Sequence, residues 1–170
     1  MFAADSKRNS NMKRTATKFL QAFIVLISIV ALVVLIRMPL SEGRAVNLDL
    51  FSIYSDPLIL YVYASSVLFF VALYNVFRLL GHIGRNKIFS PESVSTVKRI
   101  KYCAIILSVL IVLAGVYIRI FHAEEDDPAG FIALCLMTTL LSVVVAVTAA
   151  VGENILQKAI DLKSENDLTI

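Results

Sequence analysis

Ionisable side chains are scarce in this 170-residue chain, especially within its long apolar stretches. Charged residues make up 17% of the sequence and hydrophobic residues 58%, and the mean hydropathy is +0.80. A proton relay or an ion-coupled transporter needs charged groups at mid-membrane depth, where they are costly and therefore indicate function. Their scarcity weighs against ion-coupled transport.

Catalytic and metal-binding patterns are also missing. The sequence has no His-Glu-x-x-His pattern, no glycine-rich phosphate loop and no Cys-x-x-Cys pair. Its two cysteines, Cys103 and Cys135, fall near opposite ends of predicted membrane helices. At 1.5 Å per residue they should lie roughly 20 Å or more apart in depth, which excludes a disulfide between them. We therefore expect no enzyme activity, no cofactor and no metal site.

Most of the apolar residues fall in four blocks: 19–36, 58–80, 102–118 and 131–151. Each block is close to the ~20 residues that a helix needs to cross ~30 Å of hydrocarbon. Four such blocks leave too little polar surface for a water-soluble globule, so we predict an all-α integral membrane four-helix bundle of two helical hairpins. The predicted divisions are a basic segment (1–18), a transmembrane domain (19–163) with spans at 19–37, 57–80, 101–121 and 129–152, and a tail (164–170).

The first apolar block follows a basic leader, so it could be a cleaved signal peptide or an uncleaved helix. Its length of about 18 residues exceeds the roughly 7–15 of a signal-peptide core, and no small-residue cleavage site follows it. These features favour the uncleaved helix. Met1 and Met12 both fit as the start of translation.

Lysine and arginine are unevenly distributed along the chain. Of 16 such residues, 13 lie before residue 19, between residues 76 and 101, or after residue 151. Because cytoplasmic loops are enriched in Lys and Arg, both termini and the central loop are predicted to be cytoplasmic, with the protein in the cell (inner) membrane. Direct nucleic-acid binding is not indicated, since no aromatic-interleaved basic patch accompanies these residues.

Prolines mark most of the predicted helix boundaries. A capping side chain followed by proline satisfies the unpaired N–H groups at a helix start. This pattern occurs at Asp56-Pro57, Ser90-Pro91 and Asp127-Pro128. Pro39 cannot continue the hydrogen-bond ladder, so the first helix is expected to stop at residues 37–39. The third helix would run about 30 residues and the fourth would continue to about Lys163, and their cytoplasmic extensions should pack together.

A few polar residues lie at the predicted ends of the spans. Arg37 and Arg119 can extend to the outer interface, where one could pair with Asp56 or Glu42; anchoring is favoured over substrate binding. The acidic turn at residues 124–127 lacks the ligand spacing of known cation loops and is interpreted as solvated. His82 is interpreted as a single interfacial histidine without a partner.

Small residues recur at every fourth position of the last block, where they allow a neighbouring backbone to approach. These helix-packing candidates are Thr138, Ser142, Ala146 and Ala150. Packing within the bundle is favoured, and a homodimer interface is the alternative. A weak repeat also relates the two halves, since Gly81 recurs 71 residues later as Gly152. Hairpin duplication and the common constraint of bilayer thickness both explain it.

Two stretches resemble one known family. Residues 86–90, Asn-Lys-Ile-Phe-Ser, resemble a turn that leads into a basic third helix, and residues 162–170 resemble an acidic ending that closes on Asp-Leu-Thr-Ile or -Val. The family is a bacterial group of four-helix membrane proteins classed as a domain of unknown function. Its members are often encoded beside a small Cro/CI-type helix-turn-helix regulator. The resemblance implies the same architecture for the whole chain, although the extended basic amino terminus departs from it.

The resemblance and the extended third and fourth helices indicate a non-enzymatic membrane protein that binds a cytoplasmic regulator through residues 83–101 and 153–170. A terminal carboxylate on an apolar residue is a recognisable ligand, and a frayed end is the alternative. The candidate partner-binding residues are Asn86, Phe89, Lys98, Arg99, Lys101, Asp167, Leu168, Thr169 and Ile170. The alternative function is a small transporter or an immunity-type membrane protein, and the oligomeric state is not predicted.

Overall fold

The computed structural model describes residues 2–41, 57–85, 87–121 and 129–167. This part of the chain forms four helices: α1 (Phe2–Ser41), α3 (Pro57–Gly84), α4 (Pro91–Phe121) and α5 (Ala129–Asp167). Each helix contains a segment long and apolar enough to cross a membrane. The described part of the chain is therefore all-helical, with four membrane-spanning helices, as the sequence predicts for a multi-pass membrane protein.

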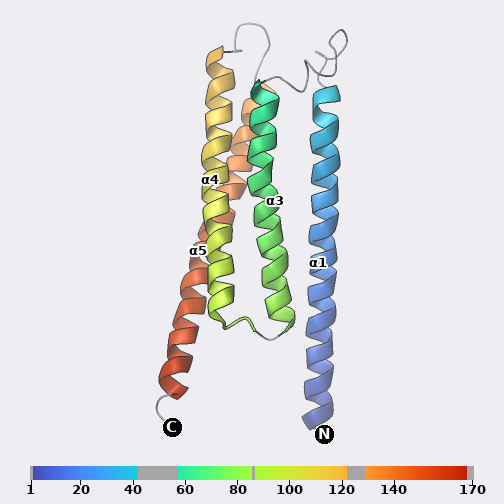
Figure 1. The fold of residues 1–170 in the computed structure, drawn as a ribbon, viewed down its shortest axis with the longest axis vertical. Helices are drawn as coiled ribbons and strands as arrows, with labels where there is room; N and C mark the ends of the chain where they lie inside the picture. Colours follow the sequence, from blue (N-terminus) through green and yellow to red (C-terminus); the bar gives the residue numbers. More distant parts are fainter. Residues whose placement is uncertain (1, 42–56, 86, 122–128, 168–170) are drawn as a thin grey trace.

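The helices lie side by side along the long axis of the molecule, with α5 tilted behind α4 (Figure 1). The most extensive contact is between α4 and α5, followed by α3 with α4 and then α1 with α3. Both chain ends and the α3–α4 turn lie at the same end of the molecule (Figure 1), which we call the loop end. The start of α1, the end of α3, the start of α4 and the end of α5 therefore lie at the loop end, and the remaining ends of these helices lie at the opposite end (Figure 1).

Two of the helices are much longer than a membrane requires. α1 has 40 residues and α5 has 39. At 1.5 Å per residue, each is about 60 Å long, roughly twice the thickness of the hydrocarbon core. Both project past the α3–α4 turn at the loop end (Figure 1). The expected extension of the last helix to about Lys163 is confirmed and exceeded, because α5 continues to Asp167.

The proline pattern correctly predicts two helix starts. α3 begins at Pro57 and α4 at Pro91, and α4 has 31 residues, close to the expected length. At the start of α4, the Ser93 N–H donates to both the Ser90 carbonyl (2.9 Å) and the Ser90 hydroxyl (3.3 Å). Ser90 is thus the capping residue that the sequence indicates. Asp56, Asp127 and Pro128 lie outside the described residues.

The predicted end of the first helix at residues 37–39 is wrong, because α1 continues through Pro39 to Ser41. Proline has no N–H, so the carbonyl of Leu35, four residues earlier, cannot receive its usual helical hydrogen bond. The hydroxyl of Tyr63 on α3 donates to this carbonyl instead, at 3.2 Å. A donor from the neighbouring helix therefore compensates for the proline within the membrane-spanning region.

Small side chains form much of the interior, which lies mainly between α4 and its neighbours. Ala104 and Ala114 of α4 are buried, as are Ser142 and Ala146 of α5. The Ser142 hydroxyl donates to the Ala104 carbonyl across the interface, at 2.8 Å. Close backbone approach of this kind is what small residues permit in membranes.

The other two helix-packing candidates on α5 are less enclosed. Ala150 is half-buried, whereas Thr138 is exposed and donates to the Leu134 carbonyl of its own helix, at 2.7 Å. The most buried part of the small-residue series is therefore its centre, at Ser142 and Ala146.

We expect Tyr63→Phe to destabilise the protein, because it leaves the Leu35 carbonyl without its donor. Side-chain hydrogen bonds between membrane helices contribute about 0.6 kcal/mol on average and up to about 1.7 kcal/mol. The loss should fall in this range, measured as the free energy of unfolding in mixed detergent micelles. Pro39→Ala restores an N–H, so Tyr63→Phe should cost less in that background. An equal cost in both backgrounds would contradict the assignment.

Tyr61→Phe is the matched control for this experiment. The Tyr61 hydroxyl donates to the Leu110 carbonyl of α4, at 2.7 Å, and so involves a different helix. Its cost should be the same whether residue 39 is proline or alanine.

Candidate functional site: the polar junction at the loop end

A ring of three hydrogen bonds closes the turn between α3 and α4. The Lys87 N–H donates to the His82 carbonyl at 2.9 Å, and the Ser93 hydroxyl donates to the Lys87 carbonyl at 3.1 Å. The His82 Nδ1 lies 3.1 Å from the Ser93 Oγ. The ring joins the last turn of α3, the connecting loop and the first turn of α4, so it fixes the direction in which α4 enters the membrane.

Ser93 is the centre of this ring, and its side chain is fully buried at 0% exposure. Its hydroxyl donates to the Lys87 carbonyl, and its oxygen also lies 3.2 Å from the Ser90 Oγ and 3.1 Å from the His82 Nδ1, where the donor depends on the tautomer of the imidazole. The interpretation of His82 as a histidine without a partner is therefore wrong. Its partner lies 11 residues away, across a turn whose path the sequence does not specify.

The ring and the adjacent Glu92 resemble a catalytic triad in composition only. The His82 Nε2 lies 3.8 Å from the Glu92 Oε2, so a serine, a histidine and an acid lie close together. A catalytic serine must reach its substrate and give its proton to the histidine. Ser93 is inaccessible and donates to a backbone carbonyl, and the Glu92 side chain is 73% exposed. We therefore assign these residues a structural role.

An ion pair joins α4 to α5 next to this turn. The Lys101 Nζ lies 2.5 Å from the Glu153 Oε2, and the two side chains are only 21% and 18% exposed. A Cβ on the adjacent Gly152 would lie 3.9 Å from the Val97 side chain. The helices are thus in close contact here, which confirms the expected packing of their extensions.

At the same end of α3, α1 packs against two glycines. A Cβ on Gly84 would lie 3.1 Å from the Thr17 side chain, and a Cβ on Gly81 would lie 3.5 Å from the Gln21 side chain. Thr17 is buried, and the Gln21 amide donates to the Phe77 carbonyl at 3.2 Å. Glycine at position 84 therefore allows α1 to approach α3 closely.

The structure separates the candidate partner-binding residues into different environments. Phe89, Lys98 and Arg99 are exposed at the loop end. Lys101 differs from them, because it is engaged with Glu153. Asn86, Leu168, Thr169 and Ile170 lie outside the described residues, as does the side chain of Asp167.

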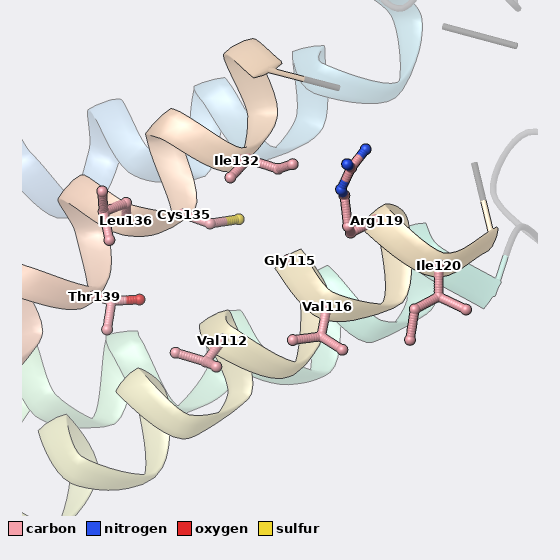
Figure 2. A pocket seen from close by; sticks show the side chains of 9 residues that line it. All are labelled: Val112, Gly115, Val116, Arg119, Ile120, Ile132, Cys135, Leu136 and Thr139. Carbon is pink, nitrogen blue, oxygen red and sulfur yellow. The ribbon is translucent and has the colours of Figure 1, made fainter. Parts of the chain in front are cut away.

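At the opposite end, Arg119 lies beside a cavity of about 410 Å³ between α4 and α5. Figure 2 shows the Cys135 sulfur and the Thr139 hydroxyl pointing into the gap between the helices, with Arg119 at its end. The Thr139 hydroxyl is buried and has no hydrogen-bond partner in the described part of the chain. Arg37 is exposed on α1. Pairing of either arginine with Asp56 stays a prediction, since Asp56 is not described.

Within the described ranges, no group of three or more His, Cys, Asp or Glu side chains could hold a metal ion. The acidic turn at residues 124–127 lies outside these ranges. Both cysteines are free thiols.

Two groups of contact residues were not predicted from the sequence. His82 and Ser93 form one, and Thr17 and Gln21 form the other. The sequence does contain a signal for the first group: Ser93 stands three residues after the capping Ser90, a position whose side chain commonly forms a hydrogen bond back toward the capping residue. The second group has a signal in Gly81 and Gly84, two glycines three residues apart on one face of the helix, where a neighbouring backbone can approach.

Comparison with known proteins gives two matches. A family described as "Protein of unknown function (DUF2975)" matches residues 15–170. The "Uncharacterized membrane protein YoaS" of Bacillus subtilis (strain 168) is 40% identical to this chain over 161 residues, which cover 94% of this chain and 100% of that protein. No solved structure matches. Residues 1–14 lie outside the family match, in the basic segment where the resemblance is expected to end.

We expect Ser93→Ala to destabilise the protein by about 1–3 kcal/mol, the usual cost of leaving buried polar partners unsatisfied. The substitution removes the donor to the Lys87 carbonyl and the hydrogen-bond partner of the His82 Nδ1. Ser95→Ala is the matched control, since Ser95 is an exposed serine in the same turn and donates to the Glu92 carbonyl. It should change stability by no more than about 0.5 kcal/mol. Equal effects of the two substitutions in thermal unfolding would argue against the ring.

The Lys101–Glu153 pair predicts rescue by charge exchange. Lys101→Glu and Glu153→Lys should each lower the unfolding temperature, because each places like charges together at a partly buried contact. The double substitution restores opposite charges and should recover most of the loss. If the double variant is no more stable than the single variants, the pair does not hold α4 to α5.

Proposed function

Because this chain belongs to the DUF2975 family of proteins of unknown function, we propose that it is a non-enzymatic membrane anchor for a cytoplasmic regulatory protein. The partner binds at the loop end. This end faces the cytoplasm in the proposal, since 13 of the 16 Lys and Arg residues belong to the segments that meet there. The resemblance to a family often encoded beside helix-turn-helix regulators favours a small DNA-binding protein as the partner.

The observation that carries this proposal is the projection of α1 and α5 past the α3–α4 turn (Figure 1). Spanning the membrane does not require this extra helix length. Leu162 of α5 lies nine residues beyond Glu153, about 13 Å further along the helix. Although its side chain is apolar, Leu162 is exposed. An apolar side chain this far beyond the ion pair is suited to contact with another protein.

The exposed charges indicate the chemistry of the partner. Lys98 and Arg99 lie on the exposed side of α4, and Phe89 is exposed in the turn before it. Aromatic and arginine side chains are enriched among residues that dominate binding, and charge complementarity guides association. A partner with an acidic surface beside an apolar contact fits this end of the molecule.

The burial of Ser93 supports a non-enzymatic role, because the serine–histidine contact found among the described residues at the loop end is inaccessible to a substrate. A soluble partner is therefore the simpler explanation for the polar surface here. If the experiment below recovers no partner, a small transporter or an immunity-type protein is the alternative function.

The test is a pull-down from native membranes in mild detergent, followed by mass spectrometry. The tag belongs on the amino terminus through a linker, which leaves Ile170 free. Recovery of a small DNA-binding protein that is lost on deletion of residues 164–170 supports the proposal. Recovery of the protein alone would contradict it.

Reversing charge at two exposed positions should abolish this capture. We expect Lys98→Glu with Arg99→Glu to reduce the recovered partner at least about tenfold, since each exposed interface charge affects association strongly. Lys98→Arg with Arg99→Lys is the matched control, because it keeps both charges and should retain binding. Lys101 is left unchanged, since its reversal would also break the contact with Glu153. Equal recovery with the reversed and control variants would rule out this surface.

A further inference from the structure

A cationic cavity lies between α1 and α3 at the loop end, separate from the surface proposed for the partner. Its volume is about 390 Å³, and its lining residues are Thr17, Lys18, Gln21, Gly81, Gly84 and Arg85. Two of these side chains carry positive charge, and no carboxylate is among them. A water molecule occupies about 30 Å³ of liquid, so the cavity has room for a group of many atoms.

Contacts between the two helices shape this cavity. Gly81 and Gly84 carry no side chain toward α1, so Thr17 and Gln21 come close to the α3 backbone. The Gln21 amide is held by the Phe77 carbonyl. Lys18 and Arg85, by contrast, are exposed at the cavity. Among the described residues, no acidic side chain forms an ion pair with either.

The two cations lie at the boundary of the membrane-spanning segments. Lys18 directly precedes the apolar block of α1, and Arg85 directly follows the last residue of α3. Lipid phosphates lie at this depth, just outside the hydrocarbon. Basic pockets between membrane helices on the cytoplasmic side recognise anionic headgroups.

We propose that this cavity binds the phosphate headgroup of an anionic phospholipid. Lys18 and Arg85 contact the phosphate from α1 and α3, and the acyl chains extend along the exposed apolar side chains that follow Lys18 on α1. Phe19 and Phe23 are both exposed there. A lipid is favoured over free phosphate because these apolar side chains offer a surface that only the lipid can use. The proposal is independent of the regulator, since it concerns purified protein and membrane lipid alone.

The test uses purified full-length protein in detergent, titrated separately with phosphatidylglycerol, with phosphatidylcholine of the same acyl chains, and with inorganic phosphate. Bound lipid is counted by native mass spectrometry, and the unfolding temperature is measured in parallel. Phosphatidylglycerol should bind more tightly than phosphatidylcholine and raise the unfolding temperature. Inorganic phosphate should do neither at matched concentration.

Neutralising the cavity should remove this preference. Lys18→Gln with Arg85→Gln is expected to weaken phosphatidylglycerol binding on the order of tenfold or more, since each interfacial cation contributes substantially to anionic lipid binding. Lys98→Gln with Arg99→Gln is the matched control, because it removes the same two charge types at the same end of the molecule and should keep the preference. The single variants Lys18→Gln and Arg85→Gln, each expected to show a partial loss, serve if the double variant fails to fold.

Three results would overturn the proposal. They are equal binding of both lipids by the unmodified protein, an equal loss in the cavity and control variants, and stabilisation by inorganic phosphate that matches the lipid. The last would identify a free phosphate site instead.

Discussion

A lipid bilayer offers no water to a backbone N–H or carbonyl group, so each must find a partner inside the protein. This constraint explains why the described segments that cross the membrane are helical. It also explains the hydroxyl groups within the spans: Ser28 and Thr148 donate to carbonyls of their own helices. Where Pro39 removes a backbone donor, the hydroxyl of Tyr63 on α3 takes its place. The proline can therefore stand inside α1 without ending it.

The same constraint sets the alignment of α1 against α3. Gln21 donates to the Phe77 carbonyl near the loop end, and Tyr63 donates to the Leu35 carbonyl nearer the opposite end. The two contacts are 14 residues apart on both helices, as an antiparallel pair in a single register requires. α1 has the least extensive contact of the four helices, yet these bonds prevent it from sliding along α3. α4 and α5 are aligned by close packing, by the Ser142–Ala104 hydrogen bond and by the Lys101–Glu153 pair.

Features that depend on one local signal were predictable from the sequence, whereas the residues that meet across the α3–α4 turn and between α1 and α3 were not predicted. Hydrophobic blocks as long as a bilayer is thick identified four spanning helices, and a cap followed by proline located Pro57 and Pro91. The helix end predicted at Pro39 was wrong because Tyr63, a residue 24 positions away, supplies the hydrogen-bond donor that the proline lacks. His82 and Ser93 were missed because their contact depends on the path of the α3–α4 turn. Lys98, Arg99 and Lys101 appear equivalent in sequence, and only the position of α5 separates the third from the others.

The pairing of Pro39 with Tyr63 also has an evolutionary consequence. The contact links the two positions: Pro39 leaves the Leu35 carbonyl without its helical donor, and the Tyr63 hydroxyl supplies one. Selection therefore acts on the two positions jointly. Relatives that carry another residue at the position of Pro39 would need the tyrosine hydroxyl less, so covariation between these positions would record the contact in the family's sequences.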